Sequence, residues 1–137
     1  MKPLSIIVLS LLSLYIISCG NDEEKSERFN LLTGVIWQSD SLLINGMDAS
    51  GPGQQLEQFK GEAVFRADGT GSFGNYTGTW RFAQNETELV ISSPALPLPL
   101  VTRIETLSSI SLKVTASFPN PLDPQSPLKL RLTFKPK

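Results

Sequence analysis

The chain has 137 residues, with 12 Lys and Arg against 13 Asp and Glu, a single cysteine, no histidine and a formal net charge of −1. A nearly neutral chain without a basic stripe does not favour nucleic-acid binding. The lack of histidine removes the commonest general base and the commonest zinc ligand, so the sequence predicts a non-enzymatic protein without cofactor or metal.

The chain begins with an apolar run, Leu4 to Ile17, that follows Lys2 and leads into Ser18-Cys19. A basic residue, an apolar stretch and a small residue before the cut are the parts of a secretory signal peptide. The run is short for a transmembrane helix, which needs about 20 residues. Its end resembles the lipobox of bacterial lipoproteins, which implies cleavage before Cys19 and a diacylglycerol on that residue. We therefore predict a signal peptide over 1–18 and a membrane anchor at Cys19.

Residues 19–28 form a polar, acidic segment that carries Asp22, Glu23, Glu24 and Glu27. It has no strand pattern, so we expect a tether that buries little apolar surface and a domain that folds without it. The acidic run resembles the segments that direct some Bacteroidota lipoproteins to the cell surface. The expected location is the cell envelope, at the outer membrane, with the periplasmic and the surface face both open. The rest, 29–137, has the length of one domain.

Eight segments of the domain have strand character. Apolar and polar residues alternate over 109–118 and 128–135, as in half-buried strands. The other six segments are shorter: 35–44, 62–66, 70–74, 78–83, 88–92 and 101–106. Apolar residues of 35–44 fall on both faces, which leaves its register open. Short helices are expected near 24–32 or 56–60. The polar face of the last segment carries Lys129 and Arg131, which we expect to face solvent.

The connections indicate how these strands are arranged. If consecutive strands pair antiparallel, the connections alternate between the two ends of the sheet. One end then holds mostly long connections: 45–60, 75–77, 93–100 and 119–127. The other end holds tight turns: 67–69, 84–87 and 107–108. This predicts an all-β fold, an eight-stranded antiparallel up-and-down barrel, closed or half-open, whose mouth lies at the end with the long loops and points away from the membrane.

Short motifs in a fixed order carry a resemblance to a known family. They are Leu31-Leu32-Thr33-Gly34, Trp37, Phe65-Arg66-Ala67-Asp68-Gly69-Thr70, Gly78-Thr79-Trp80-Arg81-Phe82, Leu89-Val90-Ile91 and Leu132-Thr133-Phe134-Lys135. Over most of the mature chain this order resembles the lipocalin-like lipoproteins of Bacteroidota. The resemblance implies a small eight-stranded lipocalin-like barrel or sandwich, generally without an assigned activity. Trp37 follows Gly34 by three residues rather than the usual two, and the loops are richer in proline than in the family.

Trp37 and Trp80 are the candidate ligand-binding residues, because large aromatic rings can stack on a ligand; the alternative is that they plug the core or a barrel end. Two functions stay open. The barrel mouth binds a small apolar or amphipathic molecule, or the barrel is filled and an envelope interaction or structural protein contacts a protein or glycan through its loops. The interior decides between them, since an eight-stranded barrel can be filled or hold one small ligand. A cavity above about 300 Å³ would favour ligand binding.

Overall fold

The computed structural model of the protein describes residues 25–137, so the predicted signal peptide and the lipidation site at Cys19 lie outside the described residues. The helices and strands in chain order are α1 (Glu27–Thr33), β1 (Trp37–Ile44), β2 (Met47–Asp48), the 3₁₀ helix η1 (Glu57–Phe59), β3 (Glu62–Phe65), β4 (Thr70–Phe73), β5 (Tyr76–Ala83), β6 (Glu88–Ser92), β7 (Leu100–Leu107), β8 (Leu112–Phe118) and β9 (Leu128–Pro136).

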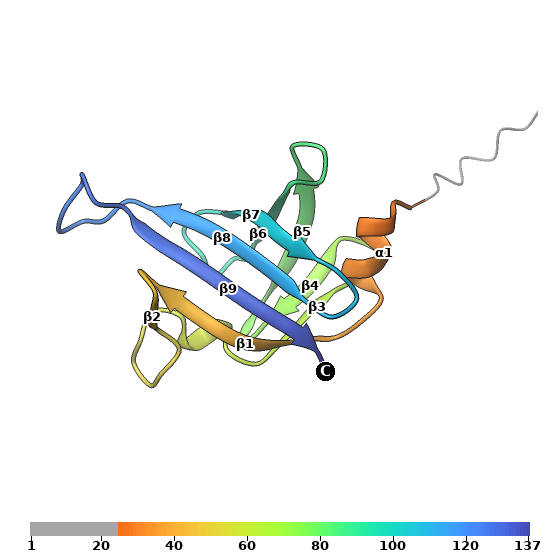
Figure 1. Ribbon diagram of the computed structural model, residues 1–137, viewed down its shortest axis with the longest axis horizontal. Helices are drawn as coiled ribbons and strands as arrows, with labels where there is room; N and C mark the ends of the chain where they lie inside the picture. Colours follow the sequence, from red (N-terminus) through yellow and green to blue (C-terminus); the bar gives the residue numbers. More distant parts are fainter. Residues whose placement is uncertain (1–24) are drawn as a thin grey trace, which may run out of the picture.

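The strands form one antiparallel sheet that closes on itself. From β3 to β9 each strand pairs with the next, and β1 pairs with β3 and β2 on one edge and with β9 on the other. The β1–β9 pairing joins the two ends of the sheet into an eight-stranded barrel, with β2 as an extra strand (Figure 1). The predicted eight-stranded antiparallel barrel is confirmed, and each predicted strand corresponds to one barrel strand.

A β-bulge in β1 explains why the apolar residues of this strand follow no simple alternation. The register with β9 shifts between Ser39 and Ser41, which leaves Asp40 as an extra residue. One inserted residue moves the following side chains to the other face. Trp37 and Leu42 are therefore both buried in the core although five positions separate them.

Strand β2 was not predicted from the sequence. Asn45 and Gly46 both have positive φ, 52° and 79°. These are the signs that a tight hairpin turn with two left-handed central residues requires, and Asn-Gly is its preferred dipeptide. The turn reverses the chain and pairs Met47 and Asp48 with the end of β1. The Asn-Gly pair was the signal that would have found this hairpin.

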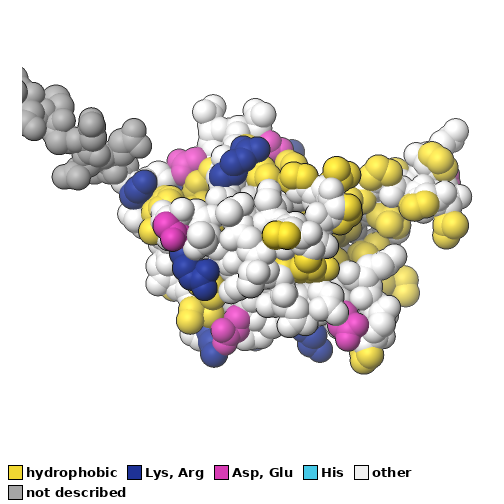
Figure 2. Space-filling model, turned by 180° about the vertical axis from the view of Figure 1, so that it is seen from behind, with side chains coloured by type: hydrophobic (Ala, Val, Ile, Leu, Met, Phe, Trp, Pro, Cys, Tyr) yellow, Lys and Arg dark blue, Asp and Glu magenta, His cyan; other side chains and the backbone are white. Residues whose placement is uncertain are grey.

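The connections lie at the two ends of the barrel as predicted. We call one end the loop rim; it is formed by residues 45–61, 74–75, 93–99 and 119–127. The other end, the turn rim, is formed by residues 66–69, 84–87 and 108–111. Figure 1 shows α1 at the turn rim and the β8–β9 connection at the opposite end of the barrel, at the loop rim. Apolar side chains gather at the loop rim on the face shown in Figure 2, and Met47, Leu98 and Leu122 are exposed there.

Helix α1 covers the turn rim. Ser26 is its N-cap, because the Ser26 hydroxyl accepts a hydrogen bond from the Phe29 amide at 3.0 Å. The Ser26 hydroxyl also donates to the Glu86 carboxylate, and Arg28 Nε donates to the Glu86 carbonyl oxygen at 3.0 Å. The short helix expected near 24–32 is therefore present. The helix begins at Glu27, inside the segment predicted as a tether. Hydrogen bonds from Ser26 and Arg28 to Glu86 connect its start to the β5–β6 turn.

Candidate functional site

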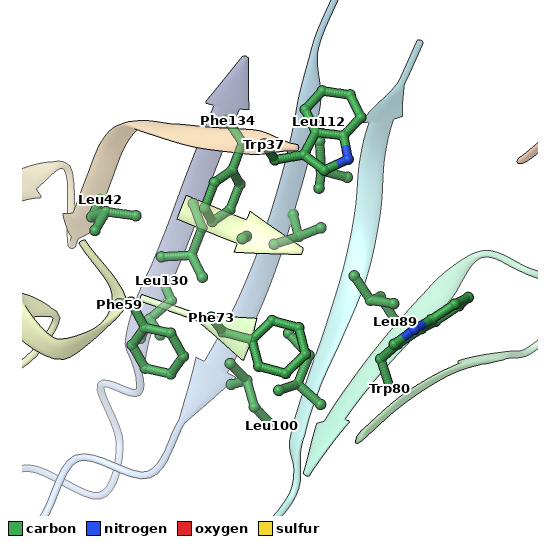
Figure 3. Close-up of a cluster of buried hydrophobic side chains, with 14 of the residues drawn as sticks. Trp37, Leu42, Phe59, Phe73, Trp80, Leu89, Leu100, Leu112, Leu130 and Phe134 are labelled. Carbon is green, nitrogen blue, oxygen red and sulfur yellow. The ribbon is translucent and has the colours of Figure 1, made fainter. Parts of the chain in front are cut away.

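The interior of the barrel is filled with side chains. The space between them has a volume of about 20 Å³ and is lined by apolar residues that include Ala63, Phe65 and Phe134. Figure 3 shows side chains of the cluster, such as Phe73, Leu130 and Phe134, projecting towards one another from different strands, with Phe59 joining them from η1. A volume of this size holds about one water molecule and lies far below the roughly 300 Å³ of small-molecule pockets. The interior therefore has no room for a ligand.

The connection between β2 and β3 closes the barrel at the loop rim. Its residues Ala49, Leu56 and Phe59 are buried in the core. The Ala49 amide donates to Leu42 O and the Leu56 amide donates to Ala49 O, each at 2.9 Å, so the connection is bonded to β1. The Phe59 ring, on η1, lies 4.7 Å from the Tyr76 ring between centroids. The helix expected near 56–60 is thus a 3₁₀ turn that covers the mouth.

Trp37 and Trp80 lie beneath α1, near the turn rim. Trp37 is 0 % exposed and its indole N–H donates to Leu32 O at 3.0 Å. Trp80 is 7 % exposed, donates to Arg66 O at 2.9 Å and packs against Phe29 with ring centroids 5.6 Å apart. Neither ring lines the small interior cavity, and both indole N–H groups have partners. The two residues therefore pack in the end of the barrel at the turn rim, beneath α1.

A large concave surface lies on the outer wall as a groove, which we call the outer groove. It has a volume of about 1040 Å³ and crosses β1, β9, β8, β7 and β6. An unbroken row of cross-strand partners runs through it: Leu43, Arg131, Thr115, Arg103 and Glu88. The groove opens at the loop rim, where Asn45 and Pro127 border it.

The next row of outward residues, nearer the loop rim, is broken. Asn45 bonds to Lys129, and Lys129 pairs with Ser117 on β8. The pairing between β7 and β8 ends at Arg103 and Thr115, so Ser117 has no partner on β7. Val101 is the β7 residue that would continue the row; it is 50 % exposed and lines the outer groove. We call the gap between residues 100–102 of β7 and 116–118 of β8 the seam.

The charges of the outer groove are unevenly distributed. Arg103 Nε and Glu105 Oε1 lie 4.0 Å apart, and Glu105 Oε1 accepts a hydrogen bond from Thr115 Oγ1 at 3.2 Å. Among residues 25–137, Lys129 and Arg131 form no ion pair. Glu88 lies at the far edge of the groove, on β6. The β9 wall therefore offers two uncompensated positive charges to a negatively charged group.

Lys129 and Arg131 were predicted to face solvent and were not recognised as part of a site. The signal was weak, because a basic polar face on a last strand is ordinary. Within the described part of the chain, no group of three or more Asp, Glu, Cys or His side chains has the geometry of a metal site.

Comparison with family models finds no match to the chain, and no curated protein matches it either. None of the helices within residues 25–137 has the length and apolar character that crossing a membrane requires.

Proposed function

We propose that this protein is a non-enzymatic interaction protein of the cell envelope, lipid-anchored at Cys19, that binds a partner protein in the outer groove. One observation carries the proposal: the barrel interior offers about 20 Å³, whereas the outer groove offers about 1040 Å³. A filled barrel is a rigid scaffold, and loops and faces on a rigid scaffold commonly carry binding. The alternative, a small apolar ligand inside the barrel, finds no support in this interior.

The orientation of the domain agrees with an anchored protein. The described chain starts at Lys25, next to α1, which covers the turn rim (Figure 1). The outer groove opens at the loop rim, at the other end of the barrel. An anchor at Cys19 would therefore leave the groove accessible from the side away from the membrane. The lipobox supports the anchor, and the closed eight-stranded barrel supports membership in the lipocalin-like lipoproteins.

Photo-crosslinking in the native organism tests the proposal. A photoreactive amino acid is placed at Thr115, in the outer groove, or at Ser109, an exposed residue of the turn rim. We expect a defined crosslinked protein from the Thr115 position and none of the same mass from Ser109. Mass spectrometry of an organic extract of the purified protein is expected to find no stoichiometric small molecule. A stoichiometric apolar compound, together with no crosslink from Thr115, would refute the proposal in favour of a ligand carrier.

A further inference from the structure

We propose that the outer groove binds an extended segment of a partner protein by strand addition at the seam, and that this segment alternates acidic and apolar residues. The inference rests on the proposed function and names the chemistry of the partner. Backbone groups on both sides of the seam point into it, and two positive side chains lie beside it.

The β7 side of the seam follows from one hydrogen bond. The Ile104 amide donates to Thr87 O, on the β6 side of β7, at 2.8 Å. In an antiparallel sheet the backbone groups of successive residues point to opposite neighbours. Arg103 and Val101 therefore direct their N–H and C=O groups towards β8. Arg103 meets Thr115 there, whereas the ladder does not reach Val101.

The β8 side follows in the same way. The Asn45 amide donates to Lys129 O at 2.8 Å, so the backbone groups of Lys129 point to β1. Those of the next residue, Leu130, then point to β8, where its partner is Ala116. By alternation, Ser117 directs its N–H and C=O away from β9 and into the seam.

Two strand edges thus face each other across the seam without pairing. Exposed edges of this kind are templates for another strand, and extended peptides bind to them by main-chain hydrogen bonds. A segment that runs antiparallel to β8 would meet the backbone groups of Ser117 and become the third strand of the β8–β9 hairpin. Figure 1 shows that this hairpin projects beyond the neighbouring strands at the loop rim, which gives such a segment access.

The side chains beside the seam specify the added strand. On the outer face, Lys129 is the cross-strand partner of Ser117, and Arg131 is the partner of Thr115. The added strand would lie two strand spacings, about 10 Å, from β9. A long side chain of Lys129 or Arg131 and an acidic side chain of the added strand can span this distance together across β8. On the inner face, Ala116 and Leu130 line the groove. An added strand therefore places acidic side chains outward and small apolar side chains inward, which is an alternating pattern.

Other occupants fit less well. In a two-fold symmetric contact between two copies, the same surface patch meets itself, so the positive pair Lys129 and Arg131 of each copy would enter an interface that already holds the same pair from the other copy. The chain's own acidic residues Asp22, Glu23 and Glu24 directly precede Lys25 in the sequence, and Lys25 adjoins α1 at the turn rim. Three residues of chain extend at most about 11 Å. The part of β8 between Leu112 and the seam at Ser117 is longer, at about 17 Å, so these residues do not fit the seam of the same molecule.

The test is a titration of the mature, isotope-labelled protein with a blocked synthetic peptide of alternating valine and glutamate. We expect binding to shift the amide resonances of Val101 and Ser117 and to slow their hydrogen exchange at least about tenfold. A peptide of the same sequence with methylated backbone nitrogens, and one with lysine in place of glutamate, are expected to bind at least about tenfold more weakly.

Variants locate the site. The double variant Lys129→Glu with Arg131→Glu is expected to abolish binding. Lys113→Glu, on the turn-rim half of β8 and outside the groove, is the matched control and is expected to bind like the wild type. Ser117→Pro removes a seam donor without removing a β8–β9 ladder bond, and it too is expected to weaken binding.

The outcomes separate the two proposals. Equal binding of the methylated peptide, or slow exchange at Val101 and Ser117 in the free protein, would overturn strand addition and leave the outer groove as an interaction site. Failure of the valine–glutamate peptide to bind at millimolar concentration would also overturn it. A dimer in sedimentation that the double charge reversal dissociates or tightens would make a second copy the occupant instead. Failure of the crosslink from Thr115 together with a stoichiometric apolar compound in the organic extract, in contrast, would overturn the proposed function itself.

Discussion

Removal of the Phe59 ring tests whether the barrel is filled. Phe59 comes from η1, in the connection that closes the loop rim, and its side chain enters the core beside Ala63. The ring also packs on Tyr76. Phe59→Ala deletes the ring without altering any barrel strand, so its effect reports on how tightly this connection fills and closes the barrel.

The structure sets the expected magnitude. Phe59 is buried, and truncation of a buried phenylalanine to alanine costs about 3–5 kcal/mol. Because Phe59 lies at the end of the core rather than at its centre, we expect a decrease in the free energy of unfolding of about 3 kcal/mol. For a domain of this size that corresponds to a Tm lower by roughly 15 °C. The space left by the Phe59 ring would join the existing interior cavity of about 20 Å³. The enlarged cavity would approach the size of an engineered cavity of about 150 Å³ that binds benzene.

Urea unfolding followed by tryptophan fluorescence measures the stability, and a thermal shift with benzene measures the new cavity. Gln58→Ala, on the same 3₁₀ turn, is the matched control; Gln58 is exposed and its side chain accepts one hydrogen bond from Asn75 at 2.9 Å. We expect this control to lose less than about 1 kcal/mol. Wild-type stability of Phe59→Ala, or stoichiometric benzene binding by the wild type, would refute the filled barrel.

Three further predictions concern the anchor, the helix and acid stability. Cys19→Ser is expected to give an uncleaved or soluble protein that no longer partitions into detergent; normal partitioning would refute the anchor. A chain starting at Phe29 loses the Ser26 cap, so its Tm should fall by about 5 °C, roughly 1 kcal/mol, relative to a chain starting at Lys25. Hydrogen bonds from the Thr70 hydroxyl and amide hold the pKa of Asp68 below its ordinary value of 3.8. Ionised Asp68 therefore stabilises the fold above pH 3.8, this contribution is lost as the pH falls through the lowered pKa, and Asp68→Asn should unfold with a weaker pH dependence in that range.

The barrel strands were predictable because each strand and each tight turn is specified by residues that are close together in the sequence. The alternation in β8 and β9 and the tight Asp68-Gly69 turn each specify a strand or a reversal without reference to the rest of the chain. The order of long and short connections then specified the two rims. β1 was ambiguous because a bulge at Asp40 changes the facing of its side chains, and no pattern in the residues marks the bulge. The start of α1 at Glu27, inside the polar segment, carries little signal in the sequence because the N-cap Ser26 is a single polar residue among other polar residues.

The outer groove was not predictable because it depends on where one ladder stops. The register between β7 and β8 shifts between Ile104 and Thr106 and ends at Arg103. Val101 and Arg103 alternate with buried neighbours as they would in a fully paired strand. The alternation of β7 therefore carries no trace of the seam. β7 is held by its pairing with β6, and β8 is held by its pairing with β9. The distance between β7 and β8 at the seam therefore depends on how the whole barrel closes.

Whether the interior is filled or hollow also depends on the whole fold. Ala63 points inward and, considered alone, permits a cavity. The space beside it is occupied by Phe59, which belongs to a connection and not to a strand. Alternation along a strand predicts only which strand side chains point inward. It therefore could not predict that the Phe59 ring enters the core from a connection. Because Phe59 comes from a closing segment, a smaller side chain at this position would enlarge the interior without a change in any barrel strand. The function of such a domain therefore depends on its closed mouth and its exposed outer wall, and the barrel fold alone does not determine it.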